Sequence, residues 1–158
     1  MKHVNLLMTG LALLVMGFVV SACKDEENPI TTVSTRPTTT ASSYTATMNG
    51  ASEKPTATTS TASGSTRVLL NETTRAISYT VTYSGLTPVA GHIHRITPNS
   101  TSGTGGVEIP FSSLTSPIVG SYTLASQARV DSFKNGYYYS NLHTTAYPNG
   151  EIRGDIKK

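Results

Sequence analysis

The chain has 158 residues, a formal net charge of +3 at pH 7 and 13% charged residues, so its composition indicates neither a strongly acidic nor a strongly basic partner. Its lysines and arginines are scattered, without the basic, aromatic-rich runs that are typical of nucleic-acid-binding proteins. The single cysteine excludes an internal disulfide and a metal site built on several thiolates. We therefore expect no nucleic-acid partner and a fold that is stabilised by its packed core.

The N-terminal residues have the pattern of an exported protein. A basic start at Lys2 precedes an apolar run over residues 6–20, which is shorter than the ~20 apolar residues of a membrane-spanning helix. Cys23 comes directly after Ser21-Ala22, and this ending resembles the lipobox of bacterial lipoproteins. We predict a signal peptide over residues 1–22 and a membrane attachment through a lipid on Cys23. The alternative is an ordinary signal peptide with a cysteine placed by chance.

Residues 23–43 are predicted to form a tether between the lipid and the folded part. Lys24-Asp25-Glu26-Glu27 resembles the surface-export signal of Bacteroidetes lipoproteins, and its alternative interpretation is a solvated charge cluster. The Thr/Ser/Pro-rich segment after it cannot bury enough apolar surface to offset the entropy of ordering. A flexible segment of this length spans ~25 Å. These features predict a lipoprotein anchored in the outer membrane of a bacterial cell envelope, with its domain exposed at the surface.

Residues 44–158 have the length of one domain and the composition of an all-β fold. The alternation is clearest over residues 75–83, where Ile77, Tyr79 and Val81 share one face and polar residues share the other. The other predicted strands cover residues 44–48, 61–70, 91–94, 107–111, 118–124, 137–144 and 151–156. About eight short strands in about 115 residues predict a Greek-key β-sandwich or barrel.

One short helix is predicted before the last two strands. Ser126 is a candidate N-cap, Val130 and Phe133 lie on one helical face, and Gly136 suits the left-handed position after a helix. A turn is predicted at Asn49-Gly50, directly after the first strand.

Three histidines lie on two of the predicted strands. His92 and His94 point to the same side, ~6.6 Å apart along the strand, and His143 shares a face with Asn141 on the later strand. Because Leu142 indicates that the other face is buried, we expect all three histidines on the outer surface. If the two strands are neighbours, three imidazoles can reach one Cu or Zn ion at ~2.0 Å each, and copper is favoured by affinity. The alternative is that the rings only hydrogen-bond to nearby backbone and polar groups.

Three motifs resemble the CHRD (chordin-type) domain, which is found in secreted and exported proteins. They are Gly91-His92-Ile93-His94, the strand over residues 139–144 and the closing segment over residues 146–154, and the resemblance extends over nearly all of residues 44–156. It implies an immunoglobulin-like β-barrel weakly similar to that of copper-zinc superoxide dismutases, which hold copper with a His-x-His strand on the outside of the barrel. The family implies no general activity. Arg95-Ile96 replace an expected glycine, so we expect a different loop shape there.

The last predicted strand places Glu151 and Arg153 on its outward face, opposite Ile152. One interpretation is an exposed cross-strand ion pair, worth ~0–1 kcal/mol. The other is that Asn141, Glu151 and Arg153 support a metal site, with Glu151 as a fourth ligand or as a hydrogen-bond partner of a ligand.

The sequence favours a binding module over an enzyme. It has neither paired carboxylates suited to hydrolysis nor a serine in a nucleophile elbow, and the mature chain lacks the fourth histidine and the disulfide that a superoxide dismutase would need. The first hypothesis is a surface-anchored, non-catalytic binding or structural module with a protein or glycan ligand. The second is an exported Cu- or Zn-binding module that uses His92, His94 and His143 and is capable of redox chemistry.

Overall fold

The computed structural model describes residues 41–158. The predicted signal peptide, Cys23 and most of the predicted tether lie outside the described residues. The first strand, β1, begins at Ala41, upstream of Tyr44, where the sequence predicted the domain to start.

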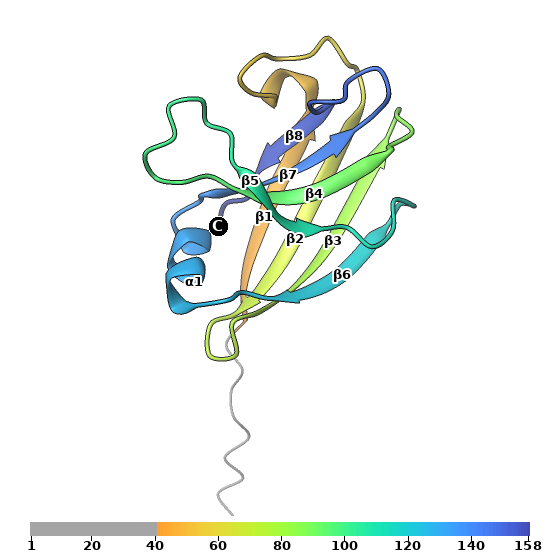
Figure 1. The fold of residues 1–158 in the computed structure, drawn as a ribbon. Helices are drawn as coiled ribbons and strands as arrows, with labels where there is room; N and C mark the ends of the chain where they lie inside the picture. The colour runs from red at the N-terminus through yellow and green to blue at the C-terminus, as the bar shows by residue number, and fades with distance from the viewer. Residues whose placement is uncertain (1–40) are drawn as a thin grey trace, which may run out of the picture. The chain divides into compact units, whose positions relative to one another are not determined.

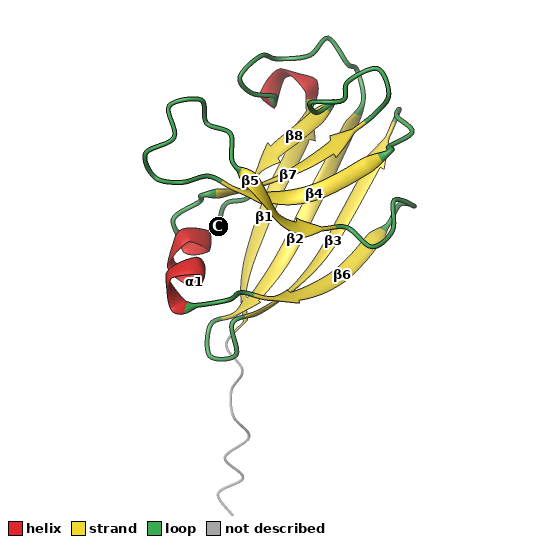
Figure 2. Ribbon diagram, viewed as in Figure 1, coloured by secondary structure: helices red, strands yellow, loops and turns green. Residues whose placement is uncertain are grey.

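Eight antiparallel strands form one sheet that rolls into a nearly closed barrel (Figures 1 and 2). The strands are β1 (Ala41–Asn49), β2 (Ser63–Asn71), β3 (Ala76–Ser84), β4 (Ala90–Arg95), β5 (Gly106–Pro110), β6 (Ile118–Thr123), β7 (Tyr138–His143) and β8 (Ile152–Asp155). Their order across the sheet is β5-β4-β7-β8-β1-β2-β3-β6, so β5 and β6 are its edges. The predicted all-β class with about eight strands and one short helix is confirmed.

Side chains that alternate along the strands fill the barrel. In β3, Ile77, Tyr79 and Val81 are buried, as their period of two predicted. The core also contains an apolar set from the other strands, the helix and the residues next to them, namely Tyr44, Ala46, Met48, Val68, Leu70, Ile93, Ile109, Ile118, Leu124, Val130, Phe133, Tyr138, Leu142, Ile152 and Ile156. Ile93 and Leu142 therefore point into the barrel, and the histidines on either side of them point away from it.

The predicted helix, α1 (Gln127–Lys134), packs on the core by the face that the sequence indicated. The Ser126 side chain accepts a hydrogen bond from the backbone N–H of Arg129, and Val130 and Phe133 are fully buried. Gly136 follows with a φ of 75°. Within residues 41–158, no helix has the length and apolar character that crossing a membrane requires.

The chain turns after β1 in a different way from the simple turn that the sequence predicted. Gly50–Ser52 form one turn of 3-10 helix, η1, because the Asn49 side chain accepts a hydrogen bond from the backbone N–H of Ser52. A long connection then runs to β2, which begins at Ser63. This connection lies beside the outer face of β7 and β8 and so contributes to the site described below.

The three histidines lie on the outer side of the barrel, as predicted, but much of this side is buried: His92 and His143 are partly exposed, whereas His94 is buried together with the outer residues of β7. Tyr139 is 4% exposed, Asn141 3% and His94 9%. Contacts from loops explain this burial: Glu53 reaches Asn141, and the backbone of Gly105 reaches His94 and Tyr139. Polar residues on the outside of the barrel therefore lie beneath a layer of loops.

Candidate metal centre

β4 and β7 are neighbours, as a shared histidine site requires. They pair antiparallel, with His92 opposite Asn141 and His94 opposite Tyr139. His143 lies opposite Ala90 in the same register. Because alternate residues share a face, the rings of His92, His94 and His143 all lie on the outer side of the two strands.

The three imidazoles are close enough to share an ion after a small adjustment. One ring nitrogen from each of the three lies within 4.8 Å of the others. His92 Nδ1 lies within hydrogen-bond distance of His143 Nε2, at 3.3 Å. This distance also matches the separation of two nitrogens bound to a tetrahedral ion at 2.0–2.1 Å, which is about 3.3–3.4 Å. One edge of the triangle therefore already has the length of a metal site.

Two backbone carbonyls determine the tautomers of His94 and His143. His94 Nδ1 lies 3.0 Å from the carbonyl oxygen of Gly105, and His143 Nδ1 lies 3.1 Å from that of Pro148. Since a carbonyl only accepts hydrogen bonds, both Nδ1 atoms carry the hydrogen and both Nε2 atoms keep a lone pair. His94 Nε2 is buried and has no hydrogen-bond partner among the described residues. In a histidine that binds a metal, the other ring nitrogen usually carries a hydrogen and donates it to an acceptor such as a backbone carbonyl.

Burial keeps the three rings in the neutral form that binds metals. Desolvation lowers the pKa of His94 to about 4, although its hydrogen bond to Gly105 opposes this effect. Desolvation also lowers the pKa of His92, with a further contribution from the charge of His143, and it lowers the pKa of His143. At neutral pH the cluster therefore offers nitrogen lone pairs instead of positive charges.

An aromatic and cationic stack fixes the ring plane of His94. The His94 ring is parallel to the Tyr139 ring, with centroids 4.8 Å apart and an interplanar angle of 5°. From β8, which lies on the other side of β7, Arg153 places its guanidinium carbon 3.6 Å from the Tyr139 centroid. The Tyr139 hydroxyl accepts a hydrogen bond from the backbone N–H of Gly105 at 3.2 Å. The position of His94 is thus determined by three segments that are distant in sequence.

Arg153 does not point into solvent, which corrects the prediction from the last strand. Its side chain is fully buried and pairs at 2.8 Å with Asp155 of its own strand, so the ion pair is not a cross-strand one. The prediction failed because the alternating pattern of a strand reveals its two faces but not the loops that cover the outer one.

Glu151 also lies beneath the loops, and its carboxylate does not join the histidine nitrogens as a ligand. Only 8% of the residue is exposed. The carboxylate accepts hydrogen bonds from the hydroxyl of Ser60, at 2.7 Å, and from that of Thr144. Its contacts hold two loops together.

A buried carboxylate that the sequence did not single out, Glu53, supports the centre of this face. Its two oxygens lie 2.8 and 3.1 Å from Asn141 Nδ2, and burial raises the pKa of its carboxyl. Gly150 fits against this pair because any Cβ there would lie 2.7 Å from both Asn141 Oδ1 and Glu53 Oε2. Glu53 lies in the connection after β1 and η1. Because strand periodicity does not show which sheet face a loop residue contacts, the sequence did not reveal this role of Glu53.

A cleft of about 280 Å³ connects this cluster with solvent. His94, His143, Tyr139 and Asn141 contribute to its lining, together with the loop residues Lys54 and Asn149. An ion held by the histidines would therefore be accessible to a ligand from outside.

Residues 44–156 match the family model of the CHRD domain. No curated protein and no solved structure matches the chain. The match includes β4, β7 and β8, and hence all three histidines.

Proposed function

The chain belongs to the CHRD domain family, and from this premise we propose that it is an envelope-anchored binding module whose centre is a three-histidine Cu or Zn site. The family supports a binding or structural role. The metal site is the more specific part of the proposal, and the geometry of the outer face of β4 and β7 supports it.

The observation that carries the proposal is the fixed orientation of His94 and His143. Hydrogen bonds to the carbonyls of Gly105 and Pro148 leave both Nε2 atoms as acceptors. The Nε2 of His94 is buried and has no partner among residues 41–158, which in the absence of a ligand would cost free energy on the order of 1–3 kcal/mol. An ion bound by His92, His94 and His143 removes this cost.

The donor set limits the choice of metal. Three imidazoles without a carboxylate or thiolate suit Cu and Zn, and Cu²⁺ has the higher intrinsic affinity for nitrogen ligands. Three protein ligands leave a coordination position for a molecule from the cleft. Bound copper would supply one-electron chemistry, so redox activity is part of the proposal.

The anchor completes the proposed role. The apolar run over residues 6–20 and Cys23 after Ser21-Ala22 support lipidation, and Lys24-Asp25-Glu26-Glu27 supports export to the outer surface. We propose that the module is tethered to the outer membrane of a bacterium and faces outward.

The test is the metal affinity of the full-length protein in detergent, measured by titration with Cu(II) and Zn(II) after treatment with a chelator. We expect one ion per chain, and we expect His92→Ala, His94→Ala and His143→Ala each to weaken binding at least about 100-fold, because each removes a ligand. Nitrogen hyperfine structure in the copper spectrum should decrease in the variants.

Thr56→Ala is the matched control, because Thr56 is exposed and lies outside the lining of the histidine cleft. Its affinity at the three-histidine site should be unchanged. A stoichiometric affinity that survives all three cluster substitutions, or no binding of either metal, would contradict the metal site and leave the module with a different kind of ligand.

A further inference from the structure

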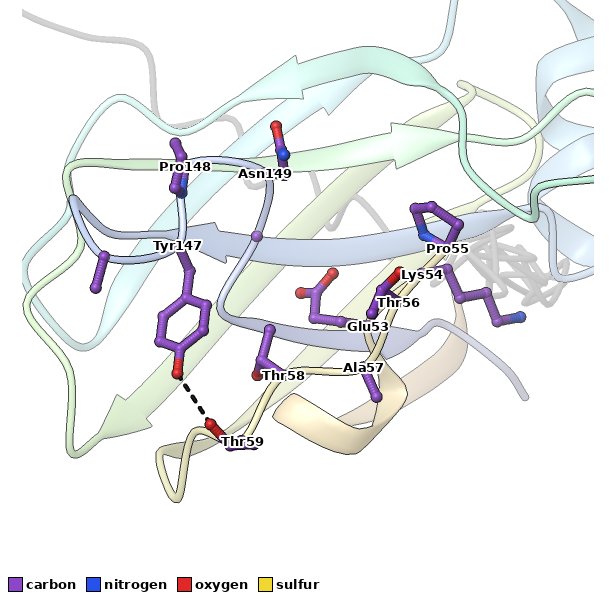
Figure 3. Close-up of a pocket in the computed structure, with 12 residues that line it drawn as sticks. Glu53, Lys54, Pro55, Thr56, Ala57, Thr58, Thr59, Tyr147, Pro148 and Asn149 are labelled. Atoms are coloured by element: carbon purple, nitrogen blue, oxygen red, sulfur yellow. Dashed lines mark hydrogen bonds between the residues drawn. The ribbon is translucent and has the colours of Figure 1, made fainter.

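A second hollow lies next to the histidine cleft. It has a volume of about 450 Å³ and lies between the loops over residues 53–59 and 146–150 (Figure 3). The two hollows share Lys54, Pro55 and Asn149 as wall residues. The two hollows are therefore adjacent, and we call them together the loop groove, with His94 and His143 in one hollow and Tyr147 in the other.

The floor of the loop groove presents hydrogen-bond acceptors. Asn141 is 3% exposed, and its Oδ1 has no hydrogen-bond partner among the described residues. The orientation of its amide is determined, because Nδ2 donates to both oxygens of Glu53. The Glu53 carboxylate is itself part of the lining and lies between the two loops in Figure 3. Such a floor suits a ligand with hydrogen-bond donors.

The walls of the groove are aromatic and hydroxylated, with little net charge. The half-buried Tyr147 ring forms one wall, and its hydroxyl lies 3.3 Å from the Thr59 hydroxyl across the groove (Figure 3). Thr56 and Asn149 add exposed polar groups. Only two side chains that line the 450 Å³ hollow are of types charged at neutral pH, Glu53 and Lys54. A flat ring beside short hydroxyl and amide groups suits a ligand with an apolar ring face and a hydroxylated rim.

We propose that the loop groove binds an uncharged oligosaccharide, whose hydroxyl groups donate to Asn141 Oδ1 and to the Glu53 carboxylate while one sugar ring packs on Tyr147. Anionic ligands are disfavoured by the carboxylate in the floor. An extended peptide is disfavoured as well, because peptides commonly add to the open edge of a sheet, and the edges here are β5 and β6, outside the groove. The proposal goes beyond the metal site and does not depend on it.

The test is calorimetric titration of the full-length, chelator-treated protein in a detergent without sugar headgroups. The probes are the neutral hexasaccharides of mannose, xylose, glucose and N-acetylglucosamine. We expect at least one to bind with a Kd below about 1 mM. Tyr147→Ala should weaken this binding about tenfold, because it removes the stacking surface, whereas Tyr147→Phe should change it less than about threefold.

Glu53→Gln provides a second variant that keeps the shape of the floor. It should weaken binding about fivefold, since hydrogen bonds to a charged acceptor are stronger than those to a neutral one. Tyr137→Ala is the control, a half-buried tyrosine outside the groove lining, and should leave binding unchanged.

Three outcomes would overturn the proposal. They are the absence of binding to all four hexasaccharides, binding that is the same in Tyr147→Ala and Glu53→Gln, and tighter binding of uncharged hexapeptide probes that is lost in Tyr147→Ala. Copper or zinc affinity is unaffected by these outcomes, so a failure here and a failure of the metal site are distinguishable.

Discussion

The direction of a hydrogen bond at one ring nitrogen determines whether a buried histidine can bind a metal. The sequence places His92 and His94 on one face of a strand, and this prediction is confirmed. The carbonyls that orient His94 and His143 belong to Gly105 and Pro148, which lie in loops. Strand periodicity contains no information about such contacts, so the tautomers follow from the structure alone.

The buried Glu53 carboxylate makes the stability of the protein depend on pH. Because burial raises the pKa of Glu53 in the folded state, the folded protein binds a proton more readily than the unfolded chain does. Its contribution to stability is therefore complete below the unfolded pKa and is lost as the pH rises through the folded pKa. We expect Glu53→Gln to be more stable than the wild type at pH 7 and to lose this advantage towards pH 4, as measured by urea denaturation across this range.

Glu72→Gln is the matched control for this prediction. Its hydrogen bond with Lys134 lowers the pKa of Glu72, so the sign is reversed and the substitution should not stabilise the protein at pH 7. A Glu53→Gln protein whose relative stability does not change with pH would show that the carboxylate is not disfavoured by burial.

At the scale of single elements, strands and helix follow local patterns, whereas the loops acquire their roles from the tertiary fold. The period of two in β3 and the cap of α1 were both predicted and are confirmed. On β7, the same period correctly separates Tyr138 and Leu142 from Tyr139 and Asn141. It does not reveal that both sets are buried, because that depends on loops from elsewhere in the chain.

The cap of α1 allows a direct test of this local encoding. Ser126→Ala removes the acceptor for the backbone N–H of Arg129 and should destabilise the protein by about 1 kcal/mol in equilibrium urea denaturation. Ser132→Ala is the control within the same helix, because the Ser132 hydroxyl donates to the Ala128 carbonyl and caps no helix end. It should change stability by less than about 0.5 kcal/mol. Equal losses in both variants would contradict a capping role for Ser126.

At the scale of the whole molecule, the proposed lipid on Cys23 determines where the domain is located. We expect Cys23→Ala to move the protein from the membrane fraction to the soluble fraction and to abolish incorporation of labelled fatty acid, since one cysteine is the only lipidation site of this kind in the chain. The measurement is fractionation of cells that express each form.

The control for this prediction separates lipidation from surface export. Replacing Asp25, Glu26 and Glu27 with serine should leave the protein in the membrane fraction but reduce its digestion by protease added to intact cells. A Cys23→Ala protein that remains with the membranes would show that another feature anchors the chain.

The sequence by itself determined the local features of this protein: the strands, the capped helix, the CHRD motifs and the shared face of His92 and His94. These depend on residues only a few positions apart, whose periodicity and capping groups can be identified directly. Only the tertiary structure decided that β4 lies beside β7, that Arg153 is buried against Tyr139, and that Glu53 meets Asn141 from 88 positions away. Contacts between residues so distant in sequence depend on how the whole barrel closes.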